Sequence, residues 1–193
     1  TNVGSANATS PNISLTAILV DICENVYVSG WGGSTNQFGS TFNMTTTPDA
    51  AQSQTDGHDL YLFVLSRDAQ ELKYATYLGG INSPGSNEPG EHVDGGTSRF
   101  DKNGIIYHAV CAACGESTPF PTTPGVHSEI VGNDNCNLAL FKLAFNLAGL
   151  RADFRIANQQ DTIVGCAPFL AEFENRSFEG ESPGIVEYEW NFD

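Results

Sequence analysis

The chain has few basic residues, a single methionine and no long apolar run. Its 193 residues include only 8 lysines and arginines against 23 acidic residues, which gives a formal net charge of −15. This excess of negative charge repels nucleic-acid phosphates and anionic lipids. No stretch approaches the roughly 20 consecutive apolar residues that a membrane helix requires. We therefore expect a protein that binds no nucleic acid and does not insert directly into a membrane.

Charged residues of both signs are also scarce, at 16% of the chain, below the usual level of about a quarter in soluble domains. Hydrophobic residues make up 40% and aromatic residues 10%, which is sufficient for a packed core. Gly, Ser, Thr and Asn take the place of the missing charges. Such a composition is typical of many short strands joined by turns. It predicts an all-β fold.

The two ends do not have the character of the ends of a gene product. The first segment is polar, lacks an initiating Met and carries no signal-peptide pattern. At the other end, the chain stops at Asp193 in the middle of what looks like a strand. We expect the chain to be a processed piece, or the ordered part, of a longer protein.

Two segments look like copies of one unit, offset by roughly 80 residues. Both begin with an apolar residue and Asp before a turn, and a β-rich run through Tyr follows, at residues 19–31 and 99–110. Asn103-Gly104 is a strong hairpin turn signal, because both residue types tolerate positive φ. The copies continue in step with a Thr-Thr-Pro motif at 46–48 and 122–124 and a strand pattern at 59–65 and 137–143.

A different pattern follows the two units. Three strands separated by turns are predicted at 151–157, 169–174 and 184–193, and the last alternates apolar and polar residues like a half-buried sandwich strand. We place a domain boundary near Gly149. Residues 1–149 then hold two units of three or four strands, at about 16–80 and 98–145, each the size of a propeller blade.

The repeated unit, through its residues 26–31, its Thr-Thr-Pro motif and residues 74–80, resembles the β-propeller repeat called SBBP. The tail, residues 150–193, resembles the first half of a PKD domain, an Ig-like sandwich, in three phrases at 165–169, 173–177 and 188–193. The resemblance implies propeller-like blade repeats followed by a partial Ig-like β-sandwich. This order of modules is similar to that of large secreted Bacteroidetes cell-surface proteins, including gliding-motility-associated proteins exported by type IX secretion.

The resemblance implies a non-catalytic extracellular structural or adhesive surface protein, with a self-assembling filament or surface layer as one form. Two blades cannot close a ring, which needs at least about four. Missing strands would come from a longer chain or from neighbouring copies by β-augmentation. The expected partners are further copies or other surface proteins. The alternatives are a polysaccharide-binding module of a larger secreted protein and a thiol- or metal-dependent hydrolase.

An odd number of cysteines leaves at least one without a partner inside the chain. Disulfides fit an extracellular protein, and we expect Cys136 to bond to Cys111 or Cys114, with Cys166 free or paired beyond Asp193. The alternative is a zinc site formed by Cys111, Cys114, His127 and Cys136. Eight residues separate His127 from Cys136, however, whereas ordinary zinc modules have about two to five between such a pair. The disulfide candidates are Cys23, Cys111, Cys114 and Cys136.

A cysteine nucleophile beside His58, His92 or His108 is the best enzymatic hypothesis, because thiolate chemistry needs an adjacent base. No local signature supports it, and we expect neither catalytic residues nor an enzyme. No cofactor is expected except calcium, whose oxygen ligands are available in two acidic loops without EF-hand spacing. The calcium candidates are Asp56, Asp59, Glu91 and Asp94.

The sequence also offers two kinds of carbohydrate site, for glycan attachment and for sugar binding. Sequons for N-glycosylation occur at Asn7, Asn12, Asn43 and Asn175, and the sequence around Thr162 looks like an O-glycosylation motif of Bacteroidetes. Aromatic residues in strands usually belong to the core, but several together can form a sugar platform. The candidates for that platform are Trp31, Trp190, Tyr27, Tyr77 and Tyr107.

Overall fold

A computed structural model confirms the all-β fold class, with nine strands and no helix among the described residues. Accordingly, those residues include no helix long and apolar enough to cross a membrane. The chain divides into a larger unit, Thr1–Phe145, and a smaller one, Asn146–Asp193. The structure describes residues 3–5, 10–21, 23–33, 39–81, 90–102, 104–114, 119–130, 135–145, 154–156, 172–177 and 189.

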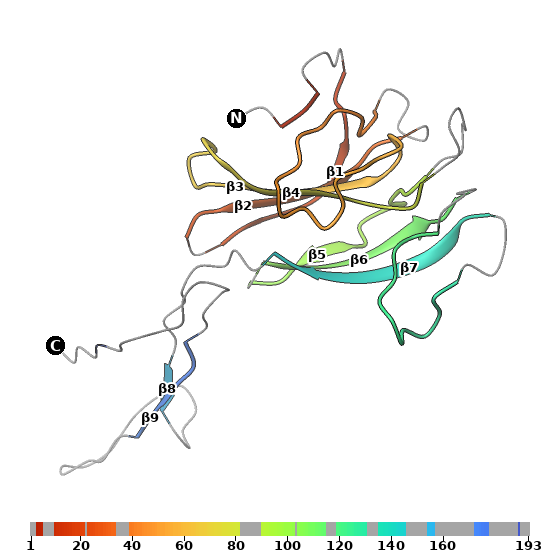
Figure 1. Ribbon diagram of the computed structural model, residues 1–193. Helices are drawn as coiled ribbons and strands as arrows, with labels where there is room; N and C mark the ends of the chain where they lie inside the picture. Colours follow the sequence, from red (N-terminus) through yellow and green to blue (C-terminus); the bar gives the residue numbers. More distant parts are fainter. Residues whose placement is uncertain are drawn as a thin grey trace, which may run out of the picture. The chain divides into compact units, whose positions relative to one another are not determined.

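The first sheet of the larger unit is antiparallel, in the order β1-β2-β3-β4 (Figure 1). Its strands are β1 (Ser14–Val20), β2 (Val26–Trp31), β3 (Leu60–Leu65) and β4 (Leu72–Leu78). The run Leu-Tyr-Leu-Phe-Val-Leu makes β3 apolar on both faces, and it is buried along almost its whole length. One face of the sheet carries a core cluster of Val28, Met44, Tyr61, Phe63, Ala75 and Tyr77.

The second sheet of the larger unit is antiparallel in the order β5-β6-β7, with β5 (Ser98–Phe100), β6 (Ile105–Ala112) and β7 (Asn137–Ala144). Burial alternates along β6, as expected for a strand with one covered face. The covered face packs on the first sheet through aromatic rings. The ring of Tyr27 lies 6.0 Å from Phe100 and 5.6 Å from Phe145, and Tyr74 lies 5.5 Å from Phe145. Figure 1 shows these two sheets as adjacent layers.

The turns that lead into β2 and β6 have the same hydrogen bonds. The N–H of Asp21 donates to the carbonyl four residues later (3.0 Å), and the N–H of Asp101 does the same (2.8 Å). In both turns the residue four positions later donates its own N–H to the Asp side chain, at 2.8 and 3.1 Å. The first three strands of each sheet also follow in the same order. In contrast, β4 has no counterpart in the described part of the second sheet.

Gly104, in the second of these turns, has a positive φ (77°). A Cβ at this position would lie 2.8 Å from the ring of Tyr27, so the ring would have to move. We expect Gly104→Ala to lower the free energy of unfolding by about 2 kcal/mol, from backbone strain and overpacking together. Gly125 has a similar φ (81°) with nothing within 4 Å, so Gly125→Ala should cost only about 1 kcal/mol. Equal losses, measured by chemical denaturation, would contradict the contact with Tyr27.

The smaller unit contains one described hairpin, β8 (Phe154–Ile156) paired antiparallel with β9 (Phe173–Asn175). The rings of Phe154 and Phe173 lie 5.8 Å apart, and Arg155 forms an ion pair with Glu174. The two strands fall largely within the predicted segments 151–157 and 169–174. Of the third predicted strand, 184–193, the structure describes only Glu189, which is exposed and not part of a strand. Cys166, Thr162 and Trp190 lie outside the described residues.

Candidate functional site

Backbone contacts hold the segment that leads from Gly90 to Asp94 against β6. Gly90 has a positive φ (63°) and passes so close to His58 that a Cβ on it would lie 2.3 Å from the His58 carbonyl oxygen. The N–H of Glu91 donates to that carbonyl (2.9 Å). His92 and Cys111 then exchange two backbone hydrogen bonds, of 3.1 and 3.0 Å, as an antiparallel bridge. Directly paired residues project from the same face of a sheet, so both side chains point the same way.

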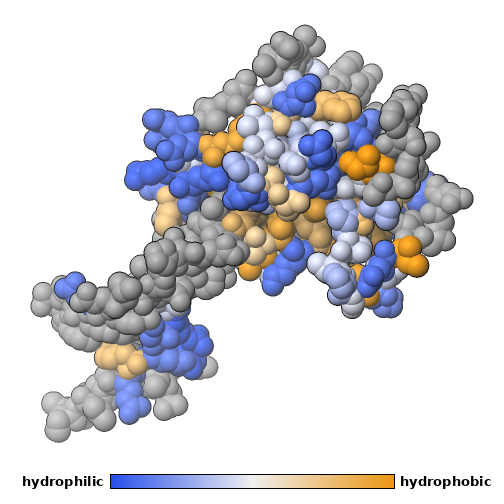
Figure 2. All heavy atoms as spheres, in the orientation of Figure 1, coloured by the Kyte–Doolittle hydropathy of each residue, from blue (hydrophilic) through white to orange (hydrophobic). Residues whose placement is uncertain are grey.

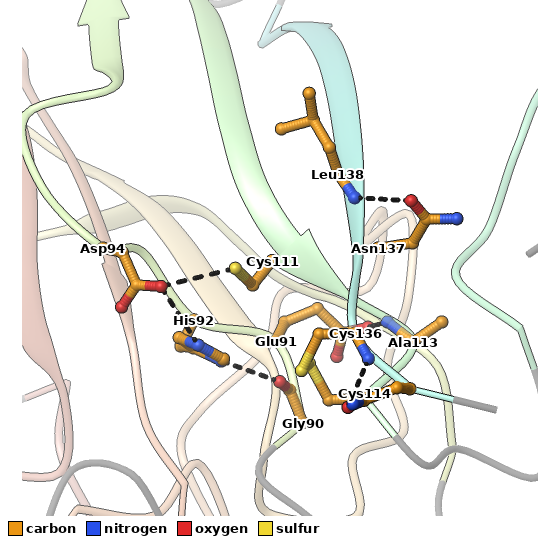
Figure 3. The surroundings of a disulfide bond; sticks show 11 residues. Gly90, Glu91, His92, Asp94, Cys111, Ala113, Cys114, Cys136, Asn137 and Leu138 are labelled. Atoms are coloured by element: carbon orange, nitrogen blue, oxygen red, sulfur yellow. Dashed lines mark hydrogen bonds and ion pairs between the residues drawn. A yellow bond between two sulfur atoms is a disulfide. The ribbon is translucent and has the colours of Figure 1, made fainter. Parts of the chain in front are cut away.

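His92, Asp94 and Cys111 form a cluster, the triad, on that face (Figure 3). One potential ligand atom from each lies within 4.8 Å of the other two. The Cys111 thiol donates to Asp94 Oδ2 (3.4 Å), and His92 Nε2 lies 3.6 Å from the same oxygen. The side chain of His92 is only 12% exposed and that of Asp94 75% exposed. A nitrogen, an oxygen and a sulfur donor therefore converge at the rim of the second sheet.

Two further contacts fix the His92 ring. Its Nδ1 lies 3.1 Å from the Gly90 carbonyl oxygen, which can only accept a hydrogen bond, so Nδ1 carries the proton. In the neutral ring Nε2 then has a free lone pair, directed toward the triad. The indole of Trp31 packs on the imidazole, with ring centroids 5.9 Å apart.

Burial raises the pKa of the Cys111 thiol above its ordinary value, with further contributions from the hydrogen bond and the negative charge of Asp94. Without a cation, the thiol is therefore protonated at neutral pH.

A disulfide joins Cys114, just beyond β6, to Cys136, just before β7 (Figure 3). Of the two partners expected for Cys136, the structure selects Cys114. Cys111 is a free thiol, and so is Cys23, which we also counted as a disulfide candidate but which is exposed on the turn after β1. The alternative zinc site is not formed, because two of its sulfurs are bonded to one another and His127 is exposed on a loop.

Two of the calcium candidates, Asp59 and Glu91, lie together in the interior. They are 0% and 1% exposed, and Asp59 Oδ1 and Glu91 Oε2 both lie within 2.3 Å of the point where a Cβ on Gly79 would sit. Glu91 Oε1 accepts hydrogen bonds from the N–H groups of Gly80 (3.1 Å) and Ala113 (3.4 Å). Glu91 therefore ties the end of β4 to the end of β6. The other two candidates lie elsewhere: Asp56 is half-buried in the preceding turn, and Asp94 belongs to the triad.

Asp59 has an unusual environment for an acid. Its Oδ2 accepts a hydrogen bond from the Thr55 hydroxyl, while Oδ1 has no hydrogen-bond partner among the described residues. Burial, and to a smaller extent the charges of Glu91 and Asp56, raise the pKa of Asp59 to about 8. The carboxyl is therefore mostly protonated at neutral pH.

Of the histidines considered as a base for a cysteine nucleophile, the structure brings His92 to Cys111. His108 lies on the opposite, buried face of β6, where its Nε2 contacts the hydroxyl of Ser98. Burial lowers the pKa of His108 to about 4, so this ring is neutral and part of the core. His58 contributes its backbone to the positioning of Gly90 and Glu91.

The candidate sugar platform is dispersed. Tyr27 and Tyr77 are buried, at 0% and 3% exposure, and Trp31 packs on His92. Tyr107 is exposed, but the ammonium of Lys142 lies 5.7 Å from its ring centre. Trp190 lies outside the described residues.

Two of the sequon asparagines are exposed, Asn43 in a loop and Asn175 in β9. The Asn12 amide nitrogen instead donates to the Ser40 carbonyl (2.9 Å), which competes with modification. Asn7 and Thr162 lie outside the described residues.

Sequence reasoning assigned the three members of the triad to three separate hypotheses: a base, a calcium ligand and a disulfide. The spacing His-x-Asp places both side chains on one face of an extended segment, and this was the available signal. No signal in the sequence indicated that His92 pairs with Cys111. In comparisons with known proteins, the chain matches no family model, no curated protein and no solved structure.

Proposed function

We propose that this chain is a non-catalytic structural or adhesive unit of an extracellular surface protein, built from propeller-like β repeats followed by part of an Ig-like PKD module. The observation that carries the proposal is the exposure of large apolar side chains on the outermost strands β1 and β7. On the face seen in Figure 2, hydrophobic side chains reach the surface of the larger unit between hydrophilic ones. Extended apolar surface of this kind is typical of interaction sites.

On β1 the exposed residues are Leu15, Ile18 and Val20, and Ile18 is 70% exposed. Ile18 pairs with Val28, a member of the core cluster, so its side chain shares the face of the sheet that carries that cluster. The face of the sheet that carries the core cluster thus extends onto β1, where the described residues leave it exposed. A further layer of β structure would bury it.

On β7 the exposed residues are Leu138 and Leu140, at 69% and 75% exposure. β7 is the outermost strand of its sheet, and a groove of about 670 Å³ runs between it and the loop of residues 119–130. An apolar strand edge beside a groove is a template for an added strand. Among the described residues no strand pairs with the outer edge of β7, where a counterpart of β4 would lie.

Two other features support the extracellular assignment. The Cys114–Cys136 disulfide is of the kind that persists in oxidising compartments, and the net charge of −15 favours solubility. The resemblance to SBBP repeats and a PKD domain favours the surface of a Bacteroidetes cell as the location, with type IX secretion as the route. The partner that completes the strand edges is then a second copy or another surface protein.

The test is assembly of the purified chain over a concentration series, followed by sedimentation and electron microscopy. We expect ordered fibres or sheets, and we expect Leu138→Asn/Leu140→Asn to raise the concentration at which they form by at least about tenfold. Each buried leucine contributes about 1.5–3 kcal/mol, and about 1.4 kcal/mol corresponds to a factor of ten. Phe42→Asn is the matched control, because Phe42 is 51% exposed and lies in a loop, outside β1 and β7. Monomers at every concentration would overturn assembly by self-association.

A further inference from the structure

We propose that the triad binds a zinc ion through His92 Nε2, the Asp94 carboxylate and the Cys111 thiolate, with a fourth coordination position open to the solvent. This inference does not depend on the proposed structural role. It rests on the donor set, on the separations between the donor atoms and on the contacts that hold them.

The donor set favours zinc over the other common biological cations. Calcium and magnesium take oxygen ligands almost exclusively, whereas the triad offers one nitrogen, one oxygen and one sulfur. Zinc is borderline soft and accepts all three types in one tetrahedral site. Three protein ligands with one open position also match the arrangement of zinc sites that bind an exogenous ligand.

Two of the three separations between donor atoms already suit the ion. Tetrahedral zinc with bonds of about 2.3 Å to sulfur and about 2.0–2.2 Å to nitrogen and oxygen requires donor atoms about 3.4–3.6 Å apart. Cys111 Sγ lies 3.4 Å and His92 Nε2 lies 3.6 Å from Asp94 Oδ2. The remaining separation, between His92 and Cys111, is within 4.8 Å, so binding of the ion would draw these two donor atoms closer together.

The surroundings hold the ligands in place before the ion arrives. The paired backbone hydrogen bonds between His92 and Cys111 fix both Cα positions. The hydrogen bond to the Gly90 carbonyl directs Nε2 toward the ion, the contact by which metal-binding histidines are usually oriented. Trp31 packs on the ring and limits its rotation. When zinc binds, the Cys111 thiol loses its proton to the solvent and its hydrogen bond to Asp94 is replaced by two bonds to the metal.

The open position faces outward on the second sheet. Cys111 pairs with Leu138 across β6 and β7, so the triad borders the exposed apolar residues of β7. Water would fill the fourth position in the isolated chain.

The experiment is a titration of the metal-free 193-residue chain with zinc, by calorimetry, and with cobalt(II) as a spectroscopic substitute. We expect one ion per chain and, for cobalt, a sulfur-to-metal charge-transfer band with the visible spectrum of a tetrahedral site. Cys111→Ser should abolish the charge-transfer band and weaken zinc binding at least about a hundredfold. Loss of even a residue that only hydrogen-bonds to a metal ligand lowers metal affinity about 10–100-fold, and Cys111 is itself a ligand. His92→Gln should weaken zinc binding to the same degree but keep the sulfur band when cobalt is in excess.

The controls are chosen to isolate the triad. Cys23→Ser and Cys166→Ser remove other thiols, and His127→Asn removes an exposed histidine; all three should bind as the wild type does. Circular dichroism establishes that each variant is folded, and His92→Gln keeps the test decisive if Cys111→Ser does not fold. No stoichiometric binding by the wild type, or a charge-transfer band that survives Cys111→Ser and disappears with Cys23→Ser or Cys166→Ser, would overturn the proposal.

Discussion

Asp59→Asn is expected to gain stability relative to the wild type as the pH rises from 4 to 8, by on the order of 5 kcal/mol in all. Asp59 is 0% exposed, and its pKa is raised from 3.8 to about 8. The folded chain therefore keeps a proton that the unfolded chain releases above pH 4, so the stabilising contribution of Asp59 declines until the pH passes 8. Each pH unit in this window is worth about 1.4 kcal/mol, and an amide does not titrate.

His108 opposes this trend in the wild type. Its pKa is lowered from 6.5 to about 4, so between these values the unfolded chain binds the additional proton and stability rises with pH. The opposite pH dependences from Asp59 and His108 nearly cancel up to pH 6.5. The free energy of unfolding of the wild type should therefore fall only between pH 6.5 and 8. The Asp59→Asn curve should instead rise from pH 4 to 6.5 and then remain level. Urea denaturation followed by tryptophan fluorescence at half-unit pH intervals measures both curves.

Asp68→Asn serves as the control for the loss of a carboxylate. Asp68 is exposed, and a hydrogen bond from the Ser66 hydroxyl lowers its pKa, so above about pH 5 it is ionised in both the folded and the unfolded chain. The stability of its variant should run parallel to that of the wild type between about pH 5 and 8. If Asp59→Asn also ran parallel, Asp59 would not be a protonated interior acid.

The strands that could be predicted are those whose residues carry the pattern by themselves. β3 is apolar on both faces, and Asn103-Gly104 marks the turn into β6. β1 could not be found in the same way, although the chain makes the same turn after it. There the residue of positive φ is Glu24 (62°), which gives no turn signal, whereas the corresponding Gly104 does. The exposure of most apolar side chains of β1 depends on what covers the sheet, and the order of residues does not specify that.

The choice between Cys111 and Cys114 depended on backbone direction. Cys111 lies within β6 and projects from its outer face, opposite to the buried His108. Ala113 then has a positive φ (54°), which turns the chain and directs Cys114 into the interior, where it is 1% exposed. The composition of Ala-Ala between the two cysteines does not indicate this reversal. The triad was hidden for a related reason: the bridge that unites it joins residues far apart in the sequence.

Removal of the disulfide by Cys114→Ser/Cys136→Ser should lower the free energy of unfolding by about 3 kcal/mol. The bond closes a loop with a sequence separation of 22, and a cross-link of that length restricts the unfolded chain by about that amount. The double variant is used because a single one would leave a new thiol near Cys111. Denaturation by urea at neutral pH measures the loss. Cys23→Ser and Cys111→Ser, which remove thiols that carry no disulfide, should change stability by less than about 1 kcal/mol.

The same variant should also weaken assembly, because residues 119–130 lie inside the disulfide loop and form one wall of the groove along β7. Without the cross-link this wall has fewer constraints, and ordering it on association costs about 1–2 kcal/mol for each residue that must be fixed again. The concentration at which fibres or sheets form should therefore rise even at temperatures where the variant is fully folded. If stability fell and assembly did not change, the groove would not be the surface through which copies associate, and the exposed face of β1 would be left as the contact.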